Sequence, residues 1–234
     1  MSQKYLAFDI ETAKVLPENV SDLNSHRPLG ITCSAIWCTD ESEPEVFYST
    51  SADGSPAPQM SKQDLTSLIK YLETKVDSGY TIITHNGLGF DFDILAEESG
   101  LYSACRSLAI QHVDMMFHFF CGKGFPISLN AAAEAIGLSK PTDINGSVAP
   151  ALWKGNNYQE VLDYVAQDCR LTLDIAETSE QNSRISWITK RGKRSYFELP
   201  SGWLTVEQAS ELPQPDTSWM DNPWPRSKFT KWLA

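Results

Sequence analysis

The stretch Tyr5-Leu-Ala-Phe-Asp-Ile-Glu-Thr12 has the alternating side chains expected of a β-strand. One face would carry Leu6, Phe8 and Ile10, and the other Tyr5, Ala7, Asp9 and Glu11. The two carboxylates would then point the same way, where they repel each other and are costly to desolvate unless a cation neutralises them. Carboxylate oxygens suit Mg²⁺ or Mn²⁺, whereas the alternative is a strand end at which acids simply meet water.

Strands and helices are expected to alternate outward from this strand. The predicted strands cover residues 30–39, 45–49, 80–85 and 112–116. The predicted helices begin at Ser61 in the capping-box-like Ser61-Lys-Gln-Asp64, at Phe90, at Ser128 and at Tyr158. This order predicts an α/β fold with a mixed sheet flanked by helices.

The last 52 residues have a different composition from the rest of the chain. Residues 183–234 carry 8 basic and 5 acidic side chains, against 11 and 25 in residues 1–182, and they hold five of the seven tryptophans. Residues 185–189 and 195–199 flank Lys190-Arg-Gly-Lys-Arg194, a pattern typical of a hairpin with a basic tip. We therefore expect one domain over 1–182, and a hairpin with a Trp/Pro-rich tail, 183–234, packed on it.

The overall composition excludes several classes of protein. The 234 residues have a net charge of −11, which argues against a protein that coats nucleic acid by bulk electrostatics. The five cysteines form no CxxC pair, and no run approaches the ~18 apolar residues of a membrane helix. The first carboxylate comes too early for a signal peptide. A cytoplasmic protein without membrane contact is expected.

Two further carboxylates stand at positions that suggest a site. Asp91 follows the turn Asn86-Gly-Leu-Gly-Phe90, with Asp93 as its rival. Tyr164 and Asp168 are four apart on the last predicted helix, in a row that continues into apolar residues and so points inward. For each acid taken alone, a structural role, in a first helical turn or at the rim of a core, is the competing interpretation.

The three motifs taken in order resemble the DEDD superfamily of 3′–5′ exonucleases. They are Phe8-Asp-Ile-Glu-Thr12, Asn86-x₃-Phe90-Asp91 and Tyr164-x₃-Asp168. The closest resemblance, over about residues 5–180, is to the proofreading exonuclease domain of family B DNA polymerases and its stand-alone relatives. The sister subclass has a His five residues before the final Asp, where this chain has Asp163, so the tyrosine subclass is the match. The resemblance implies a ribonuclease-H-like three-layer fold around a mixed five-stranded sheet.

The resemblance also implies roles for individual residues. Two divalent cations, Mg²⁺ or Mn²⁺, would be held by Asp9, Glu11, Asp91 and Asp168. Tyr164 would orient the attacking water. The residues expected near the substrate are Thr12, Asn86 and Phe90. Asp114 is expected to have a structural role, metal binding by His85 or His118 is not expected, and the 190–194 tip is a candidate for phosphate contacts.

The expected function is removal of nucleotides from the 3′ end of DNA, with single strands favoured, by two-metal-ion hydrolysis. A separate polymerase or repair protein would be the partner if the enzyme proofreads. Three alternatives remain open at this point. They are a 3′–5′ exoribonuclease, a nucleic-acid-binding module with an inactive site, and a haloacid-dehalogenase-like phosphatase whose nucleophile strand carries Asp9.

Overall fold

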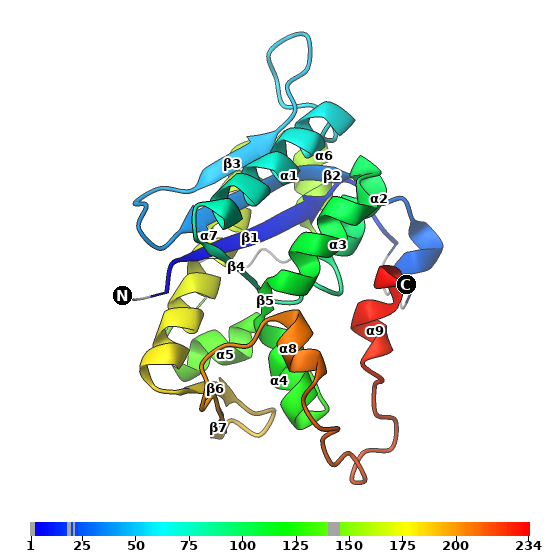
Figure 1. The fold of residues 1–234 in the computed structure, drawn as a ribbon. Coiled ribbons are helices and arrows are strands. Elements are labelled where there is room, and N and C mark those ends of the chain that lie inside the picture. The colour runs from blue at the N-terminus through cyan, green and yellow to red at the C-terminus, as the bar shows by residue number, and fades with distance from the viewer. Residues whose placement is uncertain (1–2, 18–19, 21, 140–145) are drawn as a thin grey trace.

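The fold is built on a mixed five-stranded sheet (Figure 1). A computed structural model describes residues 3–17, 20, 22–139 and 146–234. The strands are β1 (Tyr5–Thr12), β2 (Ile31–Cys38), β3 (Glu45–Tyr48), β4 (Thr81–Thr84) and β5 (Val113–Asp114), in the order β3-β2-β1-β4-β5. The central strand β1 is antiparallel to β2 and parallel to β4. The predicted ribonuclease-H-like α/β architecture is therefore confirmed.

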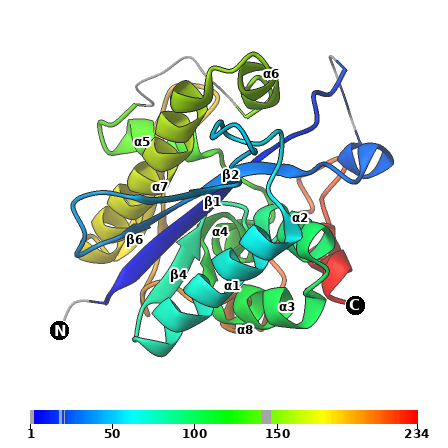
Figure 2. The ribbon, with the colours of Figure 1, turned by 90° about the horizontal axis from the view of Figure 1, so that it is seen from above.

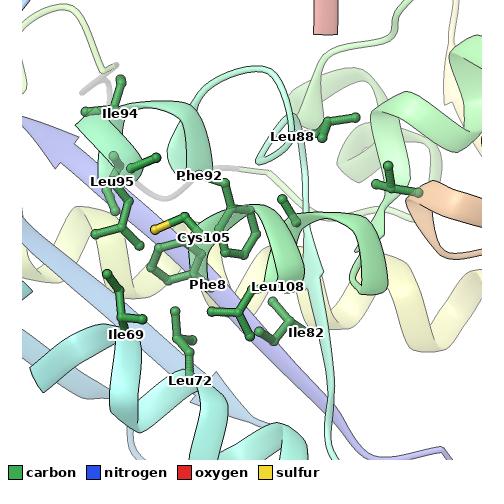
Figure 3. Close-up of a cluster of buried hydrophobic side chains, with 14 of the residues drawn as sticks. Phe8, Ile69, Leu72, Ile82, Leu88, Phe92, Ile94, Leu95, Cys105 and Leu108 are labelled. Atoms are coloured by element: carbon green, nitrogen blue, oxygen red, sulfur yellow. The ribbon is translucent and has the colours of Figure 1, made fainter. Parts of the chain in front are cut away.

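Helices cover both faces of the sheet and give the predicted three layers (Figure 2). On one side lie α1 (Lys62–Asp77), α2 (Asp91–Ser99) and α3 (Tyr102–Gln111), and on the other α5 (Leu129–Ala135), α6 (Ala149–Lys154) and α7 (Tyr158–Gln181). Because side chains alternate along β1, this strand contributes to the hydrophobic clusters on both faces of the sheet. Leu6, Phe8 and Ile10 join the cluster on the α1–α3 side, whereas Tyr5 and Ala7 join the cluster that includes α7. Figure 3 shows part of the first cluster around Phe8.

Two expectations about local structure need correction. The predicted strand 112–116 is cut to two residues, because the Asp114 side chain accepts the Phe117 N–H and caps α4 (Met115–Lys123). The cap of α1 is not a reciprocal box. Ser61 accepts the Asp64 N–H as predicted, but the Asp64 carboxylate binds the Ser61 and Ser49 hydroxyls, and the Ser61 N–H donates to Ser49.

The C-terminal segment forms the predicted hairpin and returns to the body of the protein. The hairpin is β6 (Arg184–Ile188) and β7 (Arg194–Glu198), followed by α8 (Val206–Ser210), α9 (Ser227–Thr230) and a final 3₁₀ turn (Lys231–Leu233). Trp187 and Trp203 are buried, and Phe229 joins the core on the α1–α3 side. The division into units 1–182 and 183–234 stays a prediction. In the described ranges, no helix is both long and apolar enough to cross a membrane.

Candidate active site

Asp9 on β1 and Asp91 at the start of α2 meet beside the end of the central strand. The Ile10 N–H donates to both carboxylates, at 3.1 Å to Asp9 Oδ1 and 3.0 Å to Asp91 Oδ1. Burial, and then the charges of Asp91, Glu11 and Asp168, raise the pKa of the Asp9 carboxyl well above its ordinary value. Burial also raises the pKa of Asp91, which is 4% exposed, to about 6, although hydrogen bonds from Asp9 and Ile10 act against this.

Helix α7 brings Tyr164 and Asp168 to the same place. The helix packs across β1 and β2, and both side chains are buried. Burial, followed by the carboxylates of Asp168, Glu11 and Asp9, raises the pKa of the Tyr164 phenol, and the phenol is hydrogen-bonded to Asp168. Three separate elements therefore place four carboxyl groups and one phenol within range of one another's charge.

Glu11 is buried next to this group, at the end of β1. Its side chain is 5% exposed, and its Oε2 is 3.9 Å from the position that a Cβ on Gly146 would occupy. The segment leading into α6 thus passes close to the carboxylates. Within the described part of the chain, no three His, Cys, Asp or Glu side chains are arranged as a ready-made metal site.

Asp93 has a different environment from Asp91, although it lies only two residues further along α2. Both Asp93 oxygens bind the guanidinium of Arg27, which also contacts Glu97 at 3.0 Å. Because its charge is already paired, Asp93 is a structural acid of the helix surface. Of the two acids that the sequence left open, it is Asp91 that lies beside Asp9.

The turn before α2 is held by Asp114, as the structural interpretation of that residue predicts. Asp114 accepts the N–H groups of Asn86 at 3.0 Å and Leu88 at 2.9 Å, from the neighbouring strand β5. Asn86 has a φ of 78°, and a Cβ on Gly87 would lie 2.4 Å from Thr84 Oγ1. The turn therefore needs a residue that tolerates the left-handed region, followed by one without a side chain.

The three residues expected on the substrate side lie on two different segments. Thr12 is buried at the end of β1, where the pairing with β2 is shifted by a bulge between Glu11 and Thr12. Asn86 and Phe90 belong to the turn, and the partly buried Phe90 ring packs against the α1–α3 core.

Of the two histidines considered, His85 Nε2 contacts the Ile127 carbonyl and His118 Nδ1 accepts the Leu204 N–H.

The C-terminal segment also contributes to this turn, which the sequence did not reveal. Trp232 Nε1–H donates to the Leu88 carbonyl at 2.7 Å, and the Phe229 ring lies 3.1 Å from the position of a Cβ on Gly89. The turn is thus fixed by Asp114 on one side, and by α9 and the final 3₁₀ turn on the other. The high tryptophan content of residues 183–234 indicates that this segment packs on the rest of the protein, but it does not show that Trp232 contacts the turn.

The chain belongs to the RNase H superfamily, whose family model matches residues 6–179. The sequence matches no curated protein. The family B DNA polymerase from the hyperthermophilic archaeon Pyrobaculum calidifontis has a similar structure, with a TM-score of 0.55 and 20% identity over 76% of this chain. The moderately thermophilic Exonuclease I from Methylocaldum szegediense gives a TM-score of 0.36 and 16% identity over 77% of this chain.

These solved structures are much longer than the present chain. The match covers 25% of the polymerase and 41% of the exonuclease. At such identities, the likeness to the polymerase concerns the fold. The superfamily assignment gives no support to the dehalogenase-like alternative, in which Asp9 would be a phosphatase nucleophile.

Proposed function

We propose that the protein is a metal-dependent 3′–5′ exonuclease of the tyrosine DEDD subclass, acting on DNA. The observation that carries this proposal is the meeting of Asp9, Glu11, Asp91 and Asp168, with Tyr164, at the end of the central strand. A buried carboxyl such as that of Asp9, whose pKa is raised by burial and by neighbouring carboxylates, is costly to a fold and is typical of functional sites.

The donor set fits divalent cations. Four carboxyl groups supply hard oxygen ligands, and their mutual repulsion would be relieved by positive charge. Asp9, Glu11, Asp91 and Asp168 would hold Mg²⁺ or Mn²⁺. Bound there, two such ions would supply a hydroxide near neutral pH and stabilise the departing 3′-oxygen.

The remaining site residues would position the reactants. Tyr164, which is hydrogen-bonded to Asp168, would hold the attacking water in line with the phosphorus. Thr12, buried beside Glu11, would meet the terminal nucleotide. Asn86 would offer a polar contact from the turn, and the exposed part of the Phe90 ring a stacking surface.

We expect Tyr164→Phe to lower kcat by about 10- to 100-fold, because only the water-positioning hydroxyl is lost. The loss should be smaller than that of Asp9→Ala. Tyr158→Phe is the matched control, since that hydroxyl lies on the same helix but binds Asn156. The rate of single-turnover cleavage is measured for both variants. A Tyr164→Phe enzyme as inactive as Asp9→Ala would assign the phenol a larger role than positioning.

Digestion of a 5′-labelled single-stranded DNA oligonucleotide tests the proposal directly. The reactions contain Mg²⁺, Mn²⁺ or EDTA, and Asp9→Ala protein and a matching RNA oligonucleotide run beside them. A metal-dependent ladder that shortens from the 3′ end, and is absent in the variant, is the expected result. A ladder on RNA alone would make the enzyme an exoribonuclease. Binding without cleavage would make it a module with an inactive site, and a separate polymerase or repair protein would then be sought as partner.

We expect Trp232→Phe to reduce kcat/KM on this substrate by roughly fivefold. The change removes the donor to the Leu88 carbonyl, and one hydrogen bond contributes about 1 kcal/mol. Trp219→Phe is the control, because it removes an equivalent bond, to the Asp216 carbonyl, at an exposed position. Equal activity of the two variants would show that activity does not depend on the hydrogen bond from Trp232 to the turn.

A further inference from the structure

The hairpin carries a patch of positive charge on an otherwise acidic protein. We define the basic hairpin patch as Arg184, Lys190, Arg191, Lys193, Arg194 and Tyr196. All six side chains are exposed, and residues 184–198 hold five basic side chains against the single acid Glu198. Residues 1–182, by contrast, have 25 acidic and 11 basic side chains. A local cluster of this kind attracts a polyanion even when the net charge is negative.

The hairpin is fixed to the body by its inner face. Ile185 pairs with Phe197 on this face, and Trp187 packs edge-to-face on Phe119 of α4 with ring centroids 4.9 Å apart. A Cβ on Gly122 of α4 would lie 2.3 Å from the Phe197 ring. The absence of a side chain at this glycine therefore allows β7 to pack closely against α4. Because side chains alternate along a strand, Arg184, Arg194 and Tyr196 lie on the other face, where they are exposed.

The outer face combines cations with an aromatic ring. Arg184 lies over the Tyr196 ring at 5.1 Å from its centroid, and the Tyr196 side chain is 54% exposed. Basic side chains beside an exposed ring are the features that hold single-stranded nucleic acid, since phosphates pair with the charges and bases stack on the ring. An acidic protein as the partner would pair with the positive charges, but it would have no base to stack on the ring.

The position of the hairpin suits a strand that leaves the candidate site. Helix α7 carries Asp168 and ends at Gln181, and the hairpin begins three residues later (Figure 1). At 1.5 Å per residue, this part of α7 is about 20 Å long. Measured to the start of the hairpin, where Arg184 and Tyr196 lie, that length corresponds to about six stacked nucleotides at roughly 3.4 Å each.

We propose that the basic hairpin patch binds the backbone of the single-stranded substrate about six nucleotides from the 3′ end, with Tyr196 stacking on a base. This inference rests on the proposed exonuclease function and adds a second contact region for its substrate. The patch increases affinity for long strands and takes no part in the bond cleavage.

The test compares Lys190→Gln/Lys193→Gln with Lys62→Gln/Lys70→Gln, which removes two exposed charges from α1 instead. Binding of a labelled 20-nucleotide single-stranded DNA is measured in EDTA over a salt series. We expect the hairpin variant to bind several-fold more weakly at low salt, and its slope of log K against log salt to shrink by about 1.4, or 0.7 per lost phosphate contact. The α1 variant should keep the wild-type slope.

Two further readouts separate this inference from the proposed function. In Mg²⁺, the hairpin variant and Tyr196→Ala should lose kcat/KM on the 20-nucleotide strand but not on a tetranucleotide, which is too short to reach the patch. Binding changes without any cleavage by the wild type would support the patch and remove the exonuclease proposal. Equal binding by both double variants, or no binding by the wild type, would overturn the patch.

Discussion

We expect Asp91→Asn to abolish cleavage and, in EDTA at pH 7.5, to make the protein more stable than the wild type. The loss of activity should be at least about 1000-fold, because one of the proposed cation ligands is removed. The gain in stability follows from the pKa of about 6 that burial imposes on Asp91. At neutral pH the folded protein carries a charge that the unfolded chain holds more easily, at a cost of up to about 3 kcal/mol. Asparagine can still accept the Ile10 N–H.

The same carboxyl fixes the sign of the pH dependence. A raised pKa in the folded state means that Asp91 adds stability to the wild type as the pH falls from above 6 towards 4, and the asparagine variant lacks this contribution. The advantage of Asp91→Asn should therefore disappear over this range. Urea unfolding at several pH values measures it. A variant less stable than the wild type at pH 7.5 would contradict the claim that the charge is a burden to the fold.

Asp93→Asn is the matched control, two residues away on the same helix. Burial raises the pKa of Asp93 as well, and Arg27 keeps its ion pair with Glu97, so this substitution should change stability by less than about 1 kcal/mol and leave cleavage within a few-fold of wild type. Of the two neighbouring substitutions, only Asp91→Asn should abolish cleavage and clearly raise stability. Loss of cleavage in both variants would point to damage of α2 rather than to a lost ligand.

Mn²⁺ or Mg²⁺ should raise the melting temperature of the wild type by about 5–10 °C. A ligand present at 100 times its Kd stabilises the folded state by about 2.7 kcal/mol, and each kcal/mol is worth about 2–4 °C in a chain of this size. The reason for a large response is the repulsion between the buried carboxyls, which positive charge relieves. Differential scanning fluorimetry with and without EDTA measures the shift.

Asp91→Asn should lose most of the metal-induced shift, whereas Asp93→Asn should keep it. The comparison is useful because divalent cations also bind loosely to acidic surfaces, and such binding would affect all three proteins alike. An equal shift in all three would remove the carboxylate cluster as the site of the effect.

Much of the fold could be predicted because its main signals are local. The alternation in Tyr5–Thr12 gives a strand with the predicted bounds, and the capping residues Ser61 and Ser128 mark the predicted helix starts. The error at residues 112–116 has a local cause as well. Apolar residues before and after Asp114 suit a strand, but the Asp114 side chain ends it by capping the next helix.

The residue types of the candidate site could be predicted from the sequence. The contacts that hold the surrounding segments in place could be predicted less well. Spacing alone could not separate Asp91 from Asp93, because that choice depends on Arg27, which is 66 residues away from Asp93. The hydrogen bond from Trp232 to Leu88 spans 144 residues and has no sequence pattern. Long-range contacts of this kind are set by how the packed layers bring segments together.

The path of the last residues has a practical consequence for handling the protein. Phe229 and Trp232 touch the turn that leads to Asp91, so a purification tag or fluorescent fusion joined after Ala234 would emerge beside this turn of the candidate site. The N-terminal end of β1 lies at the opposite side of the molecule (Figure 1). Labels, surface tethers and crosslinkers attached there stay away from the turn that leads to Asp91.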